Sequence, residues 1–269
     1  CEVLPVDDCG RLDLAACVRA LEQGAGPALL CVQLANNETG TLQDLSAIID
    51  LLRAADGDHC LLLDACQGAG KLAIDLAAWG VDLCVCSGHK FGAPKGCGVL
   101  AVRGVPIEPL IRGGRQQQDR RSGTEDPAAV AAMAAALEAT RSAWRASGAA
   151  IAAATEVAWR RIVDSLPAAQ WNARAADRLS GVLNIAHPGI DAAALVTRLD
   201  LAGFAVSRGA ACMAAGNRPS HVLTAIGLDQ ELARGAIRIS AGPLTSAEDL
   251  LACADAYVRE VRAMLVAGG

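Results

Sequence analysis

The chain has 269 residues and a formal charge of −5 at pH 7, which gives no basic footprint for nucleic acid. Apolar residues make up 53% of it and aromatic residues only 3%, so a large aliphatic core is expected. The sequence contains no run of about 18 apolar residues that would predict a membrane span. It also contains no charged segment followed by an apolar one that would predict a signal peptide. Eleven cysteines, many of them inside apolar segments, are typical of a reduced, cytoplasmic compartment.

The first half of the chain alternates strand and helix patterns. Residues 2–6 predict a strand that starts without any lead-in, and because the chain opens on Cys1 we expect it to be a fragment. Helical spacing of apolar residues covers 12–21 and 42–54. Short apolar runs predict strands at 28–34, 60–64, 82–87 and 98–102. Strands separated by helices predict βαβ units and a mostly parallel sheet covered on both faces.

The second half predicts a smaller α+β unit. An alanine-rich helix is expected over 127–166, followed by strands at 181–186, 204–207 and 236–240. Helices are expected at 192–201, 220–226 and 246–266. We therefore predict two domains, residues 1–144 and residues 145–269, with a cysteine-bearing loop in the second domain.

Only three lysines occur in the chain, so an enzyme that uses a Schiff base must use one of them. Lys90 follows a predicted strand in the sequence Ser-Gly-His-Lys, whose small, hydroxyl and imidazole side chains suit a phosphate. Lys71 lies in a polar turn and Lys95 in a glycine-rich loop, where a solvated surface charge is expected. Lys90 is thus the candidate nucleophile, with a surface charge as the alternative.

Asp64 ends a predicted buried strand, where an unpaired carboxylate is costly. A protonated pyridine nitrogen is one cationic partner that offsets this cost. The alternative is an ordinary turn or helix-capping aspartate. Gln67 follows three residues later and can reach the same pocket. Since active groups of parallel sheets lie beyond the carboxyl ends of the strands, Asp64 and residues 87–90 are expected at one sheet edge.

The cysteines differ in their surroundings. Cys212 lies in a small-residue, glycine-flanked stretch typical of a mobile loop, where a thiol is accessible enough to react. Cys84 and Cys86 place both thiols on one face of a predicted strand, which suits core packing. A zinc site would need a second ligand pair nearby, and the sequence offers none, so no metal is predicted.

Two polar segments allow more than one interpretation. Residues 36–40 (Asn-Asn-Glu-Thr-Gly) lie between a predicted strand and a predicted helix, where capping accounts for much of the pattern. Residues 120–125 combine cations, hydroxyl groups and a glycine. They can hold a phosphate or cap the helix that follows.

Taken together, six segments resemble the cysteine desulfurases, which are pyridoxal-phosphate enzymes of fold type I in the class V aminotransferase group. The segments are 36–40, 64–67, 87–90, 121–125, 209–212 with 219–223, and 238–240. They occur in the family's order with near-family spacing and cover essentially the whole chain. The resemblance implies an α/β fold of the PLP-dependent transferase type I, with an incomplete large domain containing a mostly parallel sheet and a smaller C-terminal α+β domain.

The resemblance also implies roles for the cofactor-binding residues. Lys90 would bond covalently to pyridoxal 5'-phosphate, and Asp64 would pair with its ring nitrogen. Asn37 and Gln67 would contact the phenolic oxygen of the ring and its surroundings.

Other implied roles concern the phosphate group, the substrate and sulfur transfer. Ser87 and His89 would hold the phosphate, with Thr124 reaching it from a partner subunit, which implies a homodimer; His89 also belongs to the implied catalytic group. Arg238, together with Asn37, would bind the carboxylate of L-cysteine. Cys212 would take the sulfur as a persulfide while L-alanine leaves.

The persulfide would then pass to an acceptor protein. The long loop between Cys212 and Arg238 resembles the branch that serves iron–sulfur cluster assembly, so an iron–sulfur scaffold is the expected acceptor class. Neither a membrane nor a nucleic acid is implied as a partner.

Alternatives to a cysteine desulfurase are a selenocysteine lyase, a related aminotransferase and a non-catalytic truncated homologue. A transaminase has no use for a loop thiol, which favours the desulfurase. Family members carry a further segment ahead of this sequence, including part of the cofactor pocket. We therefore expect weak or no activity unless that segment is supplied.

Overall fold

The computed structural model describes residues 1–24, 26–209 and 219–268. Two compact units are present. The first comprises Cys1–Ala20, Ala35–Asp44 and Ala143–Gly269, and the second comprises Leu21–Leu34 and Leu45–Ser142. The predicted division into residues 1–144 and 145–269 stays a prediction.

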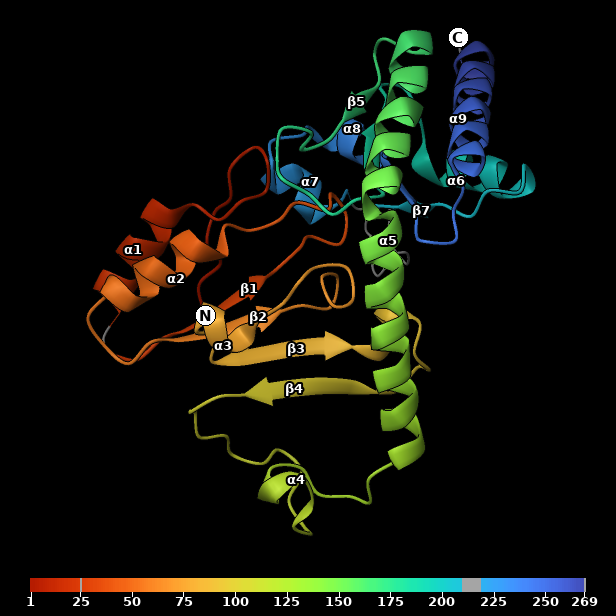
Figure 1. Cartoon of the computed structure of the whole chain (residues 1–269). Coiled ribbons are helices and arrows are strands. Elements are labelled where there is room, and N and C mark those ends of the chain that lie inside the picture. The colour runs from red at the N-terminus through yellow and green to blue at the C-terminus, as the bar shows by residue number, and fades with distance from the viewer. Residues whose placement is uncertain (25, 210–218, 269) are drawn as a thin grey trace. The chain divides into compact units, whose positions relative to one another are not determined.

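The second unit is built on a four-stranded sheet with the order β1-β2-β3-β4 (Figure 1). Its strands are β1 (Leu29–Gln33), β2 (Cys60–Asp64), β3 (Leu83–Ser87) and β4 (Gly98–Val102). The first three strands run parallel, and β4 runs antiparallel to β3. The predicted mostly parallel sheet is confirmed, and all four strands were expected within one or two residues of their bounds.

Exposure varies across this sheet. The central strands β2 and β3 have no exposed residue; in each, two residues are buried and three are half-buried, as expected for strands between two neighbours. The edge strands are more open, with Leu29 52% and Leu100 47% exposed. The expectation that both faces are covered therefore holds for the central strands and is wrong for β1 and β4.

Helices and turns connect these strands. Helix α2 (Leu45–Ala54) precedes β2, and the short α3 (Leu76–Trp79) precedes β3. A 3-10 turn, η1 (Gly88–Phe91), follows β3 directly, and α4 (Gln116–Asp119) lies before the long helix α5 (Pro127–Ser165). Phe91 at the end of η1 packs with Ala69, Ala93 and Met133, which fixes this turn against the sheet.

The first unit contains an antiparallel sheet with the order β5-β6-β8-β7. Its strands are β5 (Gln170–Trp171), β6 (Val182–Ala186), β7 (Ser207–Arg208) and β8 (Ile237–Ser240). Helices α6 (Ala192–Leu201) and α9 (Ala247–Gly268) share one apolar core with the sheet. Tyr257 of α9 and Ile185 of β6 are both fully buried in that core.

The two faces of this sheet have opposite characters. Leu183 and Ile185 of β6, with Ile237 of β8, point into the apolar core. Because side chains alternate along a strand, Asn184 and Arg238 lie on the other face, where they are register partners. This polar face carries part of the candidate site.

The remaining elements in the described part of the chain are helices. The unit also contains α7 (His221–Ala225) and α8 (Gln230–Arg234), and the chain has a further helix, α1 (Leu14–Gln23).

The predicted strand at 2–6 is wrong, because Val6 forms only an isolated bridge with Leu12 and no ladder. The strand expected at 204–207 is also shorter and shifted, since pairing begins only at Ser207.

Candidate functional site

Two of the predicted site segments lie at the same end of neighbouring strands in the second unit. Asp64 is the last residue of β2 and is the register partner of Val85 in β3. Two residues after Val85, β3 ends at Ser87, and η1 then presents His89 and Lys90. The predicted placement of Asp64 and residues 87–90 at one sheet edge is therefore confirmed.

The carboxylate of Asp64 is half-buried and already takes part in the local turn. Its Oδ1 accepts a hydrogen bond from the backbone N–H of Cys66 at 2.9 Å. Burial and a hydrogen bond to Asp64 raise the pKa of the Cys66 thiol to about 12, so this thiol stays protonated at neutral pH. The contact with Cys66 supports the interpretation of Asp64 as a turn residue, and its pairing with a pyridine nitrogen stays a prediction.

The segment after β3 gathers hydroxyl, imidazole and ammonium groups. Ser87 Oγ and His89 Nδ1 are 2.8 Å apart and form a hydrogen bond. Gly88 is buried, and a Cβ at this position would lie 2.9 Å from Cys97 Sγ and 3.0 Å from Ala93 Cβ. Only glycine fits here without displacing these atoms, so Gly88 holds the turn close to the sheet while His89 and Lys90 remain exposed.

These residues fit a pyridoxal phosphate. The cofactor needs an amine for its aldehyde, a carboxylate for its ring nitrogen and several donors for its phosphate. Lys90, Asp64 and the Ser87–His89 pair supply these three kinds of group at one edge of the sheet. Gln67 lies in the turn after β2 and is half-buried, and Thr124 is exposed.

The first unit brings together two other predicted residues, Asn37 and Arg238. Arg238 Nη1 donates a hydrogen bond to the backbone carbonyl of Asn37 at 2.5 Å, and Arg238 Nε donates to Ser240 Oγ at 3.0 Å. Asn37 belongs to the turn at 36–40, in which Asn36 Oδ1 accepts hydrogen bonds from the N–H groups of Glu38 and Thr39. Asn36 thus closes a local turn, and the helix-capping interpretation is wrong, because the next helix, α2, begins only at Leu45.

Sequence reasoning missed the buried polar residues around that turn. Glu38 is 2% exposed, and Ser220 Oγ donates to its Oε2 at 2.7 Å. Asn184 is fully buried and donates from Nδ2 to the carbonyl of Glu38 at 3.2 Å. A charged residue inside an otherwise small, uncharged turn was the available sequence signal for Glu38. Cys212, the predicted sulfur acceptor, lies outside the described residues.

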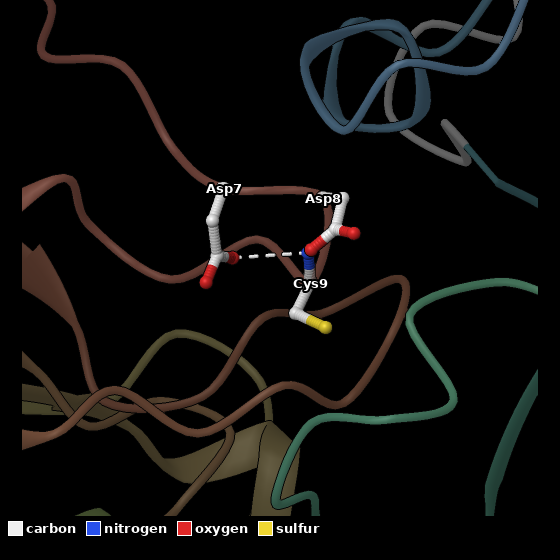
Figure 2. Close-up of side chains that lie close together, drawn as sticks. All are labelled: Asp7, Asp8 and Cys9. Carbon is white, nitrogen blue, oxygen red and sulfur yellow. Dashed lines mark hydrogen bonds between the residues drawn. The ribbon is translucent and has the colours of Figure 1, made fainter.

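Another group of side chains has the composition of a metal site. Asp7, Asp8 and Cys9 place one possible ligand atom each within 4.8 Å of one another (Figure 2). However, Asp7 Oδ1 accepts from the backbone N–H groups of Cys9 and Arg11, and its Oδ2 pairs with Arg11 Nε at 3.0 Å. These contacts show that Asp7 closes a surface turn.

No helix in the described ranges combines the length and the apolar character needed to cross a bilayer.

Comparison with known proteins identifies the family and the fold of this chain. The family model for aminotransferase class-V matches residues 1–252. Cysteine desulfurase IscS from Methanosarcina thermophila is 32% identical over 92% of this chain. A NifS-like protein from Rickettsia africae has a solved structure that superposes with a TM-score of 0.86 at 29% identity, covering 96% of this chain and 69% of that one. A structure of SspA in complex with cysteine gives a TM-score of 0.72 at 28% identity, covering 90% and 66% respectively.

The chain spans about 60% of the length of the curated relatives it matches. The residues matched by the family model, 1–252, include every segment of the candidate site. The fold is that of the PLP-dependent cysteine desulfurases, fold type I, and this chain belongs to the aminotransferase class-V family, with cysteine desulfurases among its homologues.

Proposed function

We propose that the protein is a cysteine desulfurase that uses pyridoxal 5'-phosphate to move the sulfur of L-cysteine onto Cys212. The observation that carries this proposal is the shared position of Asp64 and Lys90 at the ends of adjacent strands. An acid and an amine at one edge of a sheet are what a covalently held pyridine aldehyde requires. Homologues that are cysteine desulfurases make L-cysteine the favoured substrate.

The cofactor, when bound, supplies an electron sink for the substrate carbons. Lys90 would hold it through the ε-amine and, once released by substrate, carry protons to and from the substrate. Asp64 would keep the ring nitrogen protonated, since a carboxylate at the sheet edge stabilises the positive charge. Gln67, with the side chain of Asn37, would orient the ring through its phenolic oxygen.

The phosphate would be held by uncharged donors and an imidazole. Ser87 Oγ and His89 Nδ1 are 2.8 Å apart, so the hydroxyl and the imidazole lie together, and each could donate to a phosphate oxygen once the hydrogen bond between them opens. Thr124 is exposed, which is compatible with its hydroxyl serving the phosphate of a second subunit in a homodimer.

The substrate would be oriented by charge. Arg238 has Nη1 and Nε engaged with Asn37 and Ser240, so its guanidinium is held in one orientation. A guanidinium fixed in this way binds a carboxylate with defined geometry. We propose that the α-carboxylate of L-cysteine is its ligand.

In the proposed sulfur transfer, the thiolate of Cys212 displaces the carbon skeleton from the substrate sulfur. The Cys212 thiolate attacks the substrate sulfur, a new S–S bond forms and the Cβ–S bond breaks. The electron pair of the broken bond stays with the carbon skeleton, which takes up protons and leaves as L-alanine. The resulting persulfide is passed to an acceptor protein, for which an iron–sulfur scaffold in the cytoplasm is our proposal.

The test is the Cys212→Ser variant of the gene product in its full encoded length. This variant should retain the absorption of bound pyridoxal phosphate and lose sulfide release from L-cysteine. Sulfide release equal to that of the parent would contradict the role of Cys212. A parent protein that binds the cofactor and transaminates would favour an aminotransferase, and one that stays colourless with added cofactor would favour a non-catalytic homologue.

A further inference from the structure

Glu38 is a buried carboxylate that none of the roles above uses. It is 2% exposed and lies in the turn at 36–40. Burial raises its pKa above the ordinary value of 4.5, and this effect outweighs the hydrogen bond from Ser220 and the interactions with His221 and Arg238, which lower the pKa. Burying a carboxyl group is costly unless its partners are well placed. The residues that contact Glu38 therefore indicate what it does.

Ser220 is the direct partner of Glu38, and its hydroxyl group is fully committed. Ser220 Oγ accepts from the backbone N–H groups of Val222 and Leu223, each at 3.2 Å, and so caps α7. A serine hydroxyl has a single proton, and here that proton is donated to Glu38 Oε2 at 2.7 Å. The start of α7 is thus tied to Glu38.

Gly209 contacts the same carboxylate from the other direction. Gly209 is buried, and a Cβ built on it would lie 2.6 Å from Glu38 Oε2 and 3.6 Å from Ser220 Cβ. Its backbone therefore packs directly against the carboxylate and next to Ser220. Gly209 and Ser220 flank residues 210–219, which include Cys212, so both flanks of that stretch meet at Glu38.

The turn that carries Glu38 is itself fixed to the polar face of the β5-β6-β8-β7 sheet. Asn184 Nδ2 donates to the carbonyl of Glu38 at 3.2 Å, and Arg238 Nη1 donates to the carbonyl of Asn37 at 2.5 Å. Asn172 Nδ2 in turn donates to Asn184 Oδ1 at 2.6 Å. The proposed substrate-binding arginine and both flanks of the cysteine-bearing stretch are therefore held by two adjacent residues of one turn.

We propose that Glu38 is a positioning residue for sulfur transfer: its carboxylate fixes Gly209 and Ser220, and thereby sets where the stretch that carries Cys212 starts and ends relative to Arg238. This proposal rests on the proposed function and deepens it. Glu38 contacts neither the substrate nor the cofactor in this account. It acts through Ser220 and the backbone of Gly209.

The first experiment tests the contacts of Glu38 and does not depend on enzyme activity. Hydrogen exchange should be measured on the full-length gene product for the parent, Glu38→Ala, Glu38→Gln and Asp229→Ala. Asp229 caps α8 through the N–H of Leu232 as Ser220 caps α7, but it has no part in the Glu38 contacts, so it is a matched control.

Glu38→Ala should speed exchange of the backbone amides of Gly209, Val222 and Leu223 by about tenfold, since the hydroxyl of Ser220 loses its acceptor. Glu38→Gln keeps an acceptor oxygen and should stay within about threefold of the parent, and Asp229→Ala within about twofold. If Glu38→Ala does not fold, Ser220→Ala replaces it and should speed exchange at Gly209, which Asp229→Ala should not. Unchanged exchange at Gly209 in Glu38→Ala, or in Ser220→Ala where that variant replaces it, would overturn the proposed anchoring of Gly209 and Ser220 by Glu38.

The second experiment separates positioning from general structure. In a single turnover of the pyridoxal-phosphate-loaded protein, Glu38→Ala should slow persulfide formation on Cys212 by about tenfold. The concentration of L-cysteine that half-saturates the cofactor's spectral change should move by less than about threefold, and Glu38→Gln should restore the rate. An unchanged persulfide rate in Glu38→Ala would overturn the positioning role. A parent that forms no persulfide would overturn the proposed function while leaving the exchange result standing.

Discussion

Asn184 and Arg238 lie directly opposite each other on β6 and β8, and each donates a hydrogen bond to a carbonyl of consecutive residues, Glu38 and Asn37. Two neighbouring carbonyls of a turn are thus matched to two cross-strand partners on a sheet. Because the pair is held by the ladder between β6 and β8, the turn takes its position from the sheet. This relationship ties the proposed substrate-binding residue to both the β5-β6-β8-β7 sheet and the turn at 36–40.

Replacing Asn184 should lower stability. Asn184→Ala leaves the amide of Asn172 and the carbonyl of Glu38 without their partners in a buried region. An unsatisfied buried polar group costs about 1–3 kcal/mol, so the free energy of unfolding should fall by about that amount. Urea denaturation measures it. Thr197→Ala, which removes an exposed hydrogen bond within α6, should change stability by less than about 0.5 kcal/mol and serves as the control. Equal midpoints for both variants would contradict this prediction.

Replacing Arg238 should weaken substrate binding. Arg238→Gln removes the positive charge, and a hydrogen bond to a charged group contributes about 1.5–3 kcal/mol. The concentration of L-cysteine that half-saturates the spectral change should therefore rise by about ten- to a hundredfold. Arg234→Gln, an exposed arginine of α8, is the control and should leave it unchanged. A half-saturation that moves equally in both variants would rule out Arg238 as the carboxylate ligand.

The hydroxyl of Tyr257 offers a test of the apolar core. Tyr257 is fully buried in α9, its Oη has no hydrogen-bond partner within the described ranges, and burial raises its pKa. Tyr257→Phe removes an unsatisfied polar group, so the free energy of unfolding should stay equal or increase. Tyr257→Ala should lower it by about 3–5 kcal/mol through lost packing. A loss of more than about 1 kcal/mol in the phenylalanine variant would mean that the hydroxyl has a partner after all.

The raised pKa of Glu38 predicts a specific pH dependence of stability. As pH rises past 4.5, the unfolded chain loses the proton of this carboxyl group while the folded protein keeps it. The folded state then binds more protons, so the stability contribution is present at low pH and is lost as pH rises through the folded pKa. Urea denaturation over a pH series should show the parent losing stability relative to Glu38→Gln in that interval. A difference that is constant with pH would contradict the burial argument.

The sequence predicted the regular elements well because their apolar periodicity is strong. Strand β2 was expected at its observed bounds, and the placement of Asp64 and Lys90 followed from where parallel strands end. The short elements α3, β5 and α8 were not predicted, because four or five residues, or a two-residue strand, carry too little pattern. The partners of Glu38 could not be predicted either, since Asn184 and Ser220 lie far from it in the chain and only the tertiary fold brings them together.

The central claim is that Lys90 carries the cofactor. The full-length gene product should be incubated with pyridoxal 5'-phosphate, reduced with borohydride, digested and mapped by mass spectrometry. The account predicts a phosphopyridoxyl adduct on the peptide that contains Lys90 and its loss in Lys90→Ala. An adduct found on Lys71, Lys95 or another lysine, with Lys90 unmodified, would contradict it.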